Sequence, residues 1–201
     1  MNKDFITSLR PAIILTILFA LLLGIVYPLV MTGIGQVFFP SQANGSLIRD
    51  PQGQVVGSRV VGQAFVTDRY FQTRPSAAGK GYDGLASSGS NLGPTSKALV
   101  NRVGADINKQ RDAGITGSVP IDLVTASASG LDPHLSPASV LVQVKRVARA
   151  RRLPETHIRD LVNQNVDHPL LGFLGEDRVN LLALNRQLDQ LTADRRTGGA
   201  R

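Results

Sequence analysis

The feature that most constrains this chain is an uncharged stretch near its N-terminus. Residues 11–48 contain no Asp, Glu, Lys, Arg or His, and residues 11–31 are mostly Ile, Leu, Val, Ala and Phe. At about 1.5 Å of rise per residue, residues 11–31 form roughly 31 Å of helix, the thickness of a bilayer's hydrocarbon core. A core helix of a soluble protein rarely stays apolar for so long without a polar face. We therefore predict one membrane-spanning helix, because no second stretch of this kind follows.

The same segment could instead be a cleaved secretory signal. Signal peptides have apolar runs of about 7–15 residues that end at a small-x-small cleavage site. The Ser-Gln-Ala sequence at 41–43 resembles such a site, but the apolar run is too long and the site lies well past its end. We favour a retained anchor. Lys3 and Arg10 against Asp4 give a positive bias before the helix, which predicts a cytoplasmic N-terminus and a domain on the other side of the membrane.

The predicted layout has four parts. Residues 1–10 form a cytoplasmic tail, 11–37 the transmembrane helix region, 38–191 one extracytoplasmic α+β domain, and 192–201 a flexible polar tail. The domain is long enough to bury roughly 70% of the surface of its unfolded chain. The chain has no cysteine, which excludes disulfides and thiolate metal sites but leaves the compartment open.

Small residues recur along the predicted membrane helix. Ala20, Gly24, Pro28 and Thr32 are four residues apart and share one face. Small side chains let a second helix approach closely, so this face predicts helix packing with a partner. A chance origin is the alternative, because small residues are common in membrane helices. Pro28 removes a backbone donor and should kink the helix in its outer third.

Beyond the span, the pattern changes from irregular to helical. The Val-Val pairs at 55–56 and 60–61 predict short strands or a hairpin, and residues 121–124 predict a buried strand. Residues 67–94, rich in Gly, Ser and Asn, predict a long loop that is either disordered or an interaction surface. Capping residues and apolar positions three or four apart predict helices at 96–111, 136–152, from 154 onward and at 179–191.

A search for catalytic motifs finds no constellation. Gly79-Lys80 resembles the end of a phosphate-binding P-loop, but Arg74 stands where that motif needs Gly and Gly81 where it needs Ser or Thr. The three histidines lack metal-ligand spacing, and no serine lies in a Gly-x-Ser-x-Gly elbow. We therefore predict a chain that is not an enzyme by itself and holds no metal.

The densest run of charge comprises Lys145, Arg146, Arg149, Arg151 and Arg152. Nucleic-acid binding would require neighbouring aromatic residues for base stacking, and none is near. On the predicted helix these side chains lie opposite a stripe of valines. The pattern favours a solvated helix face first, contact with anionic lipid second and nucleic acid last.

A set of unusual strings carries more information than any single motif. The strings are Leu9-Arg10-Pro11, Tyr27-Pro28-Leu29, Phe38-Phe39-Pro40, the sequence QANGSL at 42–47, Tyr70-Phe71, RPSA at 74–77, GSNLGP at 89–94, VTASASGLD at 124–132, Val179-Asn180 and Leu184-Asn185. In this order and spacing they resemble the C subunit of the Kdp-type high-affinity potassium-transporting ATPase of bacteria, from Leu9 to about Leu191. Ser88 departs from the family pattern, which usually has glycine there.

The resemblance implies a role in potassium uptake at the bacterial inner membrane. In that family a separate P-type pump subunit hydrolyses ATP, a channel-like subunit carries the ion, and the C subunit is needed for assembly and activity. The C subunit is described as a catalytic chaperone that raises the pump's affinity for ATP through a ternary complex with nucleotide. From the strings we select a candidate partner-contact surface: Tyr70, Phe71, Arg74, Ser90, Asn91, Ser129 and Asp132.

Two roles are compatible with the resemblance. ATP sites of P-type pumps are cytoplasmic, whereas the charge bias places this domain outside, where a cap over the ion entrance that docks the channel-like subunit fits better. The alternative to a pump subunit is a stand-alone membrane-anchored periplasmic module that binds an envelope component.

Overall fold

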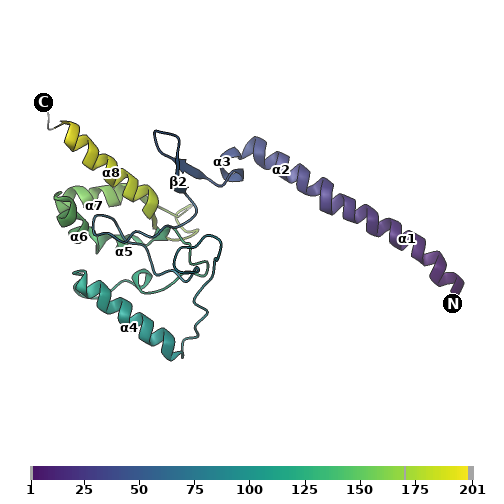
Figure 1. Ribbon diagram of the computed structural model, residues 1–201, viewed down its shortest axis with the longest axis horizontal. Coiled ribbons are helices and arrows are strands. Elements are labelled where there is room, and N and C mark those ends of the chain that lie inside the picture. The colour runs from purple at the N-terminus through teal and green to yellow at the C-terminus, as the bar shows by residue number, and fades with distance from the viewer. Residues whose placement is uncertain (1, 170, 199–201) are drawn as a thin grey trace. The chain divides into compact units, whose positions relative to one another are not determined.

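The computed structural model of the chain describes residues 2–169 and 171–198 (Figure 1). It has an α+β fold and separates into two units, Met1–Leu47 and Ile48–Arg201. The first is a long apolar helix and the second is a small mixed domain; the two sheets of the described chain are short. The predicted fold class is therefore confirmed.

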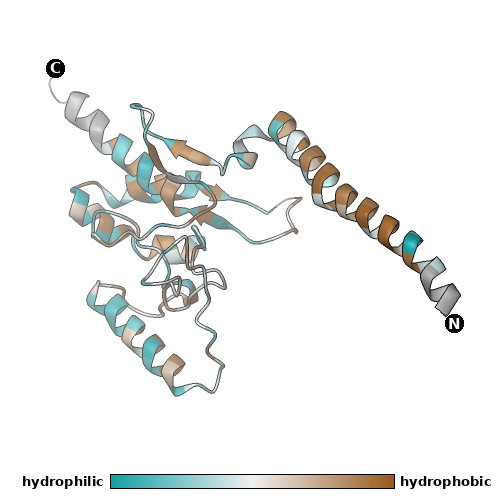
Figure 2. Cartoon of the chain, turned by 45° about the vertical axis from the view of Figure 1, so that its right-hand side comes forward, coloured by the Kyte–Doolittle hydropathy of each residue, from teal (hydrophilic) through white to brown (hydrophobic). Residues whose placement is uncertain are grey.

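The first unit is one long helix with a local change of pitch. Helix α1 (Asn2–Leu21) leads through the π-helix η1 (Leu22–Val26) into α2 (Tyr27–Phe38), and a short α3 (Pro40–Ala43) follows. In the described part of the chain, residues 7–38 form the one helix that is long and apolar enough to cross a membrane. Figure 2 shows its nearly continuous apolar colouring.

The π-helix ends at Val26, two residues before Pro28. Proline has no N–H to donate, and its ring presses on the carbonyl four residues earlier in an α-helix. In η1 the Tyr27 N–H donates to the Leu22 carbonyl, one residue further back than in an α-helix. The structure therefore has a π-bulge next to the proline at which we predicted a kink.

The predicted valine hairpin is only partly correct. Strand β1 (Leu47–Arg49) pairs with β2 (Val55–Ser58), while residues 60–61 contribute only an isolated bridge between Ser58 and Val61. The turn lies on the N-terminal side of β2 because the Asp50 carboxylate accepts the N–H groups of two turn residues, Gln52 and Gln54, at 3.0 and 2.8 Å.

A three-stranded antiparallel sheet joins distant parts of the second unit. Its order is β3 (His134–Leu135), β5 (Arg178–Asn180), β4 (Val166–Asp167). The core of this unit lies among β5 and four helices: α5 (Pro137–Leu141), α6 (Val144–Arg151), α7 (Glu155–Gln164) and α8 (Leu181–Gly198). Its most buried side chains are Phe71, Leu123, Leu135, Val140, Val144, Val147, Ile158, Val162, Val179, Leu181, Leu184 and Leu188.

Two predicted elements are wrong. Residues 121–124 are not a strand but begin with a 3-10 turn, η2 (Ile121–Leu123), in which the Leu123 N–H donates to the Pro120 carbonyl at 3.1 Å. The helix predicted at 136–152 is two helices, α5 and α6, with a break between Leu141 and Val144. At the break, the Gln143 side chain turns to the backbone of a distant loop, where it accepts from the Gln72 N–H at 2.8 Å.

The other predicted helices are present. Helix α4 (Lys97–Asp112) matches the prediction for 96–111, and α7 begins after Pro154 as expected. The last helix starts later than predicted, because Val179 lies in β5 and the Asn180 side chain accepts the Ala183 N–H at 3.1 Å, which caps α8. Helix α8 continues to Gly198, past the predicted start of a polar tail at residue 192, and residues 199–201 of that tail lie outside the described residues.

The long Gly/Ser/Asn-rich connection is confirmed as a loop. No helix or strand occurs from residue 59 to residue 96. The loop packs against the domain, because Phe71 and Ala78 are fully buried. This packing argues against the disordered alternative, and the role of the loop as an interaction surface stays a prediction.

Candidate partner-contact surface

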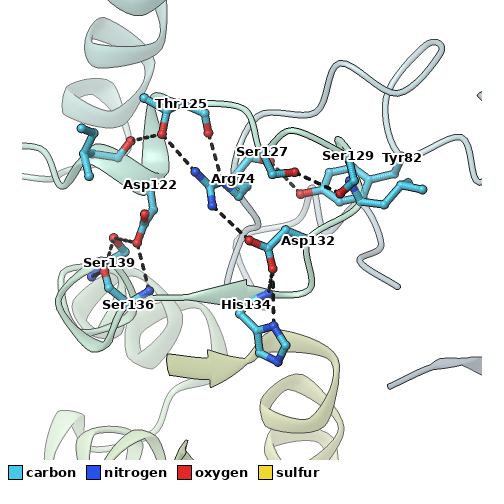
Figure 3. Close-up of polar contacts among 12 residues, drawn as sticks. Arg74, Tyr82, Asp122, Thr125, Ser127, Ser129, Asp132, His134, Ser136 and Ser139 are labelled. Atoms are coloured by element: carbon cyan, nitrogen blue, oxygen red, sulfur yellow. Dashed lines mark hydrogen bonds and ion pairs between the residues drawn. The ribbon is translucent and has the colours of Figure 1, made fainter. Parts of the chain in front are cut away.

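Arg74 forms the centre of a polar network built from three loop segments (Figure 3). Its Nη1 donates to the Asp132 carboxylate at 3.1 Å, and its Nε and Nη2 donate to the carbonyl and hydroxyl oxygens of Thr125, each at 3.1 Å. The Thr125 hydroxyl in turn donates to the Ile121 carbonyl at 2.8 Å. The guanidinium therefore ties the long loop to the segment that follows η2.

Asp132 is held as a carboxylate by its neighbours. It also accepts the backbone N–H of His134 at 3.0 Å and lies 3.4 Å from the imidazole Nδ1. Burial by itself raises the pKa of Asp132, but the hydrogen bonds from His134 and the positive charge of Arg74 outweigh burial, so the pKa lies below its ordinary value. The folded domain therefore stabilises the ionised form of Asp132.

Asp122, in η2, has a similar environment. Its carboxylate accepts the Ser136 N–H at 2.9 Å and the Ser139 hydroxyl at 3.0 Å, beside the start of α5. Burial again raises the pKa of Asp122, and the bonds from Ser136 and Ser139 with the charge of Arg74 lower it further than burial raises it. Ser136 and Ser139 at the start of α5 thus hold η2 in place through the Asp122 carboxylate. The sequence analysis did not predict this contact.

A second set of contacts joins the Ser/Gly strings. The Ser76 hydroxyl donates to the Gly130 carbonyl at 2.6 Å and accepts the Tyr82 N–H at 2.8 Å. The Ser129 carbonyl accepts from the Ser88 N–H at 3.1 Å. The Tyr82 hydroxyl donates to the Arg74 carbonyl at 2.7 Å, and burial raises the pKa of Tyr82. These contacts therefore join the strings at 74–77 and 124–132 with Ser88, directly before the string at 89–94, into one connected surface.

Tyr70 and Phe71 anchor the loop to α8. The Asn185 side chain accepts the Phe71 N–H at 2.9 Å and donates to the Phe71 carbonyl at 3.0 Å, and both residues are buried. The Tyr70 hydroxyl donates to the Asp189 carboxylate at 3.0 Å. Burial and that bond raise the pKa of Tyr70, so the phenol remains a donor.

The basic run at 145–152 differs from the solvated face that we predicted. The Arg151 side chain is 1% exposed and donates to the Arg69 carbonyl at 2.6 Å and to the Asp189 carboxylate at 2.8 Å. Arg146 donates to the backbone carbonyls of Asp68 and Tyr70 at 3.0 and 3.1 Å. These two arginines fasten residues 68–70, whereas Lys145, Arg149 and Arg152 are exposed.

The structure divides the predicted contact residues into two groups. Arg74, Ser129 and Asp132 belong to the connected Ser/Gly surface, with Ser90 half-buried and Asn91 exposed on the same loop at a positive φ of 50°. Tyr70 and Phe71 belong instead to the contact with α8, and the Phe71 side chain lies in the core rather than on the surface. Gln143, Arg151 and Asn185, which also hold the loop, were not among the predicted contact residues, although Asn185 belongs to one of the strings.

Two clefts border these contacts. One of about 390 Å³ lies beside Arg74 and Asp132 and reaches Glu176 and Asp177. Another of about 440 Å³ is lined by Lys145, Arg146 and Arg149 together with Asp68 and Asp112. The three cations would attract an anion into this cleft, and the two carboxylates would repel it. Among the described residues, no group of three or more His, Cys, Asp or Glu is placed to hold a metal ion.

Ala20, Gly24 and Pro28, on the small-residue face of the membrane helix, lie before, inside and after the π-bulge. In an α-helix, residues eight apart are displaced by roughly 80° around the axis, so Ala20 and Pro28 would drift apart. A π turn contains more residues per turn, which brings Pro28 back toward the side of Ala20. Gly24 lies inside the bulge, and a Cβ there would meet no atom within 4 Å.

These features define a class of protein: a membrane-anchored chain with a single apolar span and one α+β domain whose polar loops are cross-linked by buried arginine and serine contacts. Residues 9–190 match the family described as "K+-transporting ATPase, c chain", KdpC. This chain belongs to the KdpC family, and the predicted resemblance is confirmed. Membership makes it a membrane subunit of a potassium-transporting ATPase.

Curated relatives align with this chain over nearly their whole length. A protein of Caulobacter vibrioides is 52% identical over 184 residues, which cover 92% of this chain and 93% of the relative. A protein of Geobacter sulfurreducens is 52% identical over 185 residues (92% and 98%), and one of Koribacter versatilis is 48% identical over 189 residues (94% and 95%). Each is named "Potassium-transporting ATPase KdpC subunit".

Proposed function

We propose that this chain is a non-catalytic accessory subunit of an ATP-driven, high-affinity potassium-uptake complex and is needed for the assembly and activity of that complex. The observation that carries the proposal is the family match over residues 9–190, which includes both the apolar span and the domain. Its partners are then a P-type pump subunit that hydrolyses ATP and a channel-like subunit that carries the ion.

We place the chain in the bacterial inner membrane with its N-terminus in the cytoplasm and its domain in the periplasm. The charge bias of Lys3 and Arg10 over Asp4 supports this orientation. In this position the domain serves as a cap that docks the channel-like subunit at the ion entrance. Loops pinned by Arg74, Arg146 and Arg151 favour such a role, because a pre-ordered surface loses little entropy when a partner binds.

A second candidate role is to raise the pump subunit's affinity for ATP by contacting the nucleotide. The cleft with Lys145, Arg146 and Arg149 is the observation that favours it. Asp68 and Asp112 in the same cleft oppose phosphate, and a periplasmic domain would be separated from a cytoplasmic ATP site. The cap role is therefore the preferred one.

Growth on limiting potassium tests the proposed function. A strain that lacks this chain but keeps the other subunits should fail to grow at micromolar potassium and recover at millimolar potassium. Reintroducing the full chain should restore growth and should recover the pump and channel-like subunits after mild detergent extraction. Normal growth of the deletion strain at micromolar potassium would refute the accessory role.

Two further measurements separate the cap role from nucleotide contact. Because the chain has no cysteine, Leu85→Cys and Ile121→Cys place single exposed labels on the domain. Both should react with a membrane-impermeant maleimide on spheroplasts. Calorimetric titration of the full chain in nanodiscs with ATP should show no saturation up to millimolar concentration. Saturable binding that Lys145→Ala abolishes, together with labels protected until lysis, would favour the nucleotide role.

A further inference from the structure

The connection between β4 and β5 displays apolar side chains to solvent. Leu171, Phe173 and Leu174 are 74%, 73% and 53% exposed and lie within four residues of one another. A single exposed apolar side chain is ordinary on a protein surface, whereas adjacent exposed large ones mark an interaction site. Figure 2 shows the hairpin extending from its two strands beyond the body of the domain.

The base of this hairpin is firmly held. Strand β5 is the central strand of its sheet and pairs with both β3 and β4, and its Val179 is fully buried. Across the base, the His168 Nδ1 lies 2.7 Å from the Asp177 carboxylate. The Gly172 N–H donates to the Pro169 carbonyl at 3.1 Å and closes a turn. The apolar residues therefore project from a rigid support.

The backbone at the tip carries a conformation that leucine disfavours. Leu171 has φ +56°, in the left-handed region, where a bulky side chain is a true outlier. An exposed leucine in this conformation benefits neither from burial nor from a relaxed backbone. Such a local conflict is expected where a second molecule covers the residue.

Charge around the tip distinguishes a protein partner from a lipid surface. The strands and turn at 167–178 carry Asp167, Glu176 and Asp177 against a single cation, Arg178, in a chain whose formal net charge is +7. An acidic rim is repelled by anionic headgroups but complements a socket with basic side chains at its edge. The charge pattern thus favours a protein surface.

We propose that the tip formed by Leu171, Phe173 and Leu174 is a docking element that inserts into an apolar socket, rimmed by basic side chains, on the channel-like subunit of the same complex. The inference rests on the proposed function and names the element through which the domain docks. The apolar tip provides the buried centre of the contact, and Glu176 with Asp167 provides its charged rim.

Photo-crosslinking in native membranes tests the contact directly. A benzophenone amino acid at position 173 of the full chain, in cells that contain all subunits, should yield an adduct with the channel-like subunit identified by mass spectrometry. The control places the same group at position 100, where Val100 is 64% exposed on α4, outside the candidate contact surface, and should give no such adduct. An adduct at position 173 with lipid alone, or with a second copy of this chain, would overturn the inference.

Substitution provides the energetic test. The double variant Phe173→Ser, Leu174→Ser should lower the amount of co-purified channel-like subunit at least tenfold, and Glu176→Lys should lower it several-fold at low salt, whereas Val100→Ser on α4 should not. All variants should retain the circular-dichroism melting curve of the original chain, because these side chains are exposed. Unchanged recovery with the double variant refutes the docking role alone. Failure of the unaltered chain to recover any subunit refutes the proposed function as well.

Discussion

The Arg151 guanidinium carbon lies 4.8 Å from the centre of the Tyr70 ring, and both side chains bind the carboxylate of Asp189. Arg151 also donates to the Leu188 carbonyl at 3.3 Å. One buried cation therefore joins α6, α8 and the start of the long loop. The loop that carries most of the predicted contact residues is ordered by this contact.

Arg151→Met should destabilise the domain by about 3 kcal/mol, because it keeps the volume of the side chain but leaves buried acceptors unsatisfied. Unfolding of the full chain in mild detergent, followed by circular dichroism in denaturant, measures the change. Arg149→Met is the matched control, since Arg149 is exposed on the same helix, and should change stability by less than about 0.5 kcal/mol. Equal effects of the two variants would mean that Arg151 contributes no specific contact.

The basic run illustrates why such contacts were not predicted from the sequence. Arg151 follows Val144 by seven residues and Val147 by four, so helical spacing places it on the valine stripe, and the prediction of a solvated position for it was wrong. Only the folded chain shows its partner, the Arg69 carbonyl, 82 residues away. By contrast, the apolar span needed no tertiary information, and the buried face of α7, Ile158, Leu161 and Val162, followed from local spacing alone.

Short elements were the least predictable. A four-residue segment such as 121–124 has too few residues to separate a strand from a helical turn, and here Pro120 with Asp122 favoured the turn. Strands β3 and β4 have two residues each, too few for any alternation to appear. The break before α6 depends on Gln143 binding Gln72, a partner 71 residues away.

Acid should weaken the Arg74 network. The pKa of Asp132 is lower in the folded than in the unfolded chain, so the folded chain binds fewer protons and stability rises with pH. The contribution is complete above the ordinary carboxyl pKa of 3.8 and is lost as the pH falls through the lower folded value. Denaturant unfolding between pH 6 and pH 2.5 should show a smaller loss in Asp132→Asn than in the original chain.

The matched control for this experiment is Asp112→Asn, which also removes one negative charge but from an exposed position at the end of α4. Its stability profile should run parallel to that of the original chain. A profile of Asp132→Asn that is also parallel would contradict the assigned role of the Arg74–Asp132 pair.

Gly130 should not tolerate a side chain. It has φ +67°, and an added Cβ would lie 2.6 Å from the Ala78 nitrogen and 2.7 Å from the Ser88 carbonyl oxygen. Gly130→Ala should therefore cost about 3 kcal/mol, from both the disfavoured backbone and the clash with backbone atoms. Gly117→Ala isolates the first effect, since Gly117 has φ +90° and open space around it, and should cost about 1 kcal/mol. Thermal unfolding that gives equal losses would show that the close approach of the loops is absent.

The face of the membrane helix gives the last prediction. Gly24 lies in the π-bulge before Pro28, where a Cβ would meet nothing within 4 Å of the same chain, so Gly24→Leu should not disturb the helix itself. If another helix packs on the face of Ala20, Gly24 and Pro28, the leucine blocks its close approach and should lower recovery of partner subunits about tenfold after detergent extraction. Gly33→Leu is a close control, because Gly33 also has open space and lies off this face. Equal recovery with the two variants would leave docking to the domain alone and would identify the small-residue face as incidental.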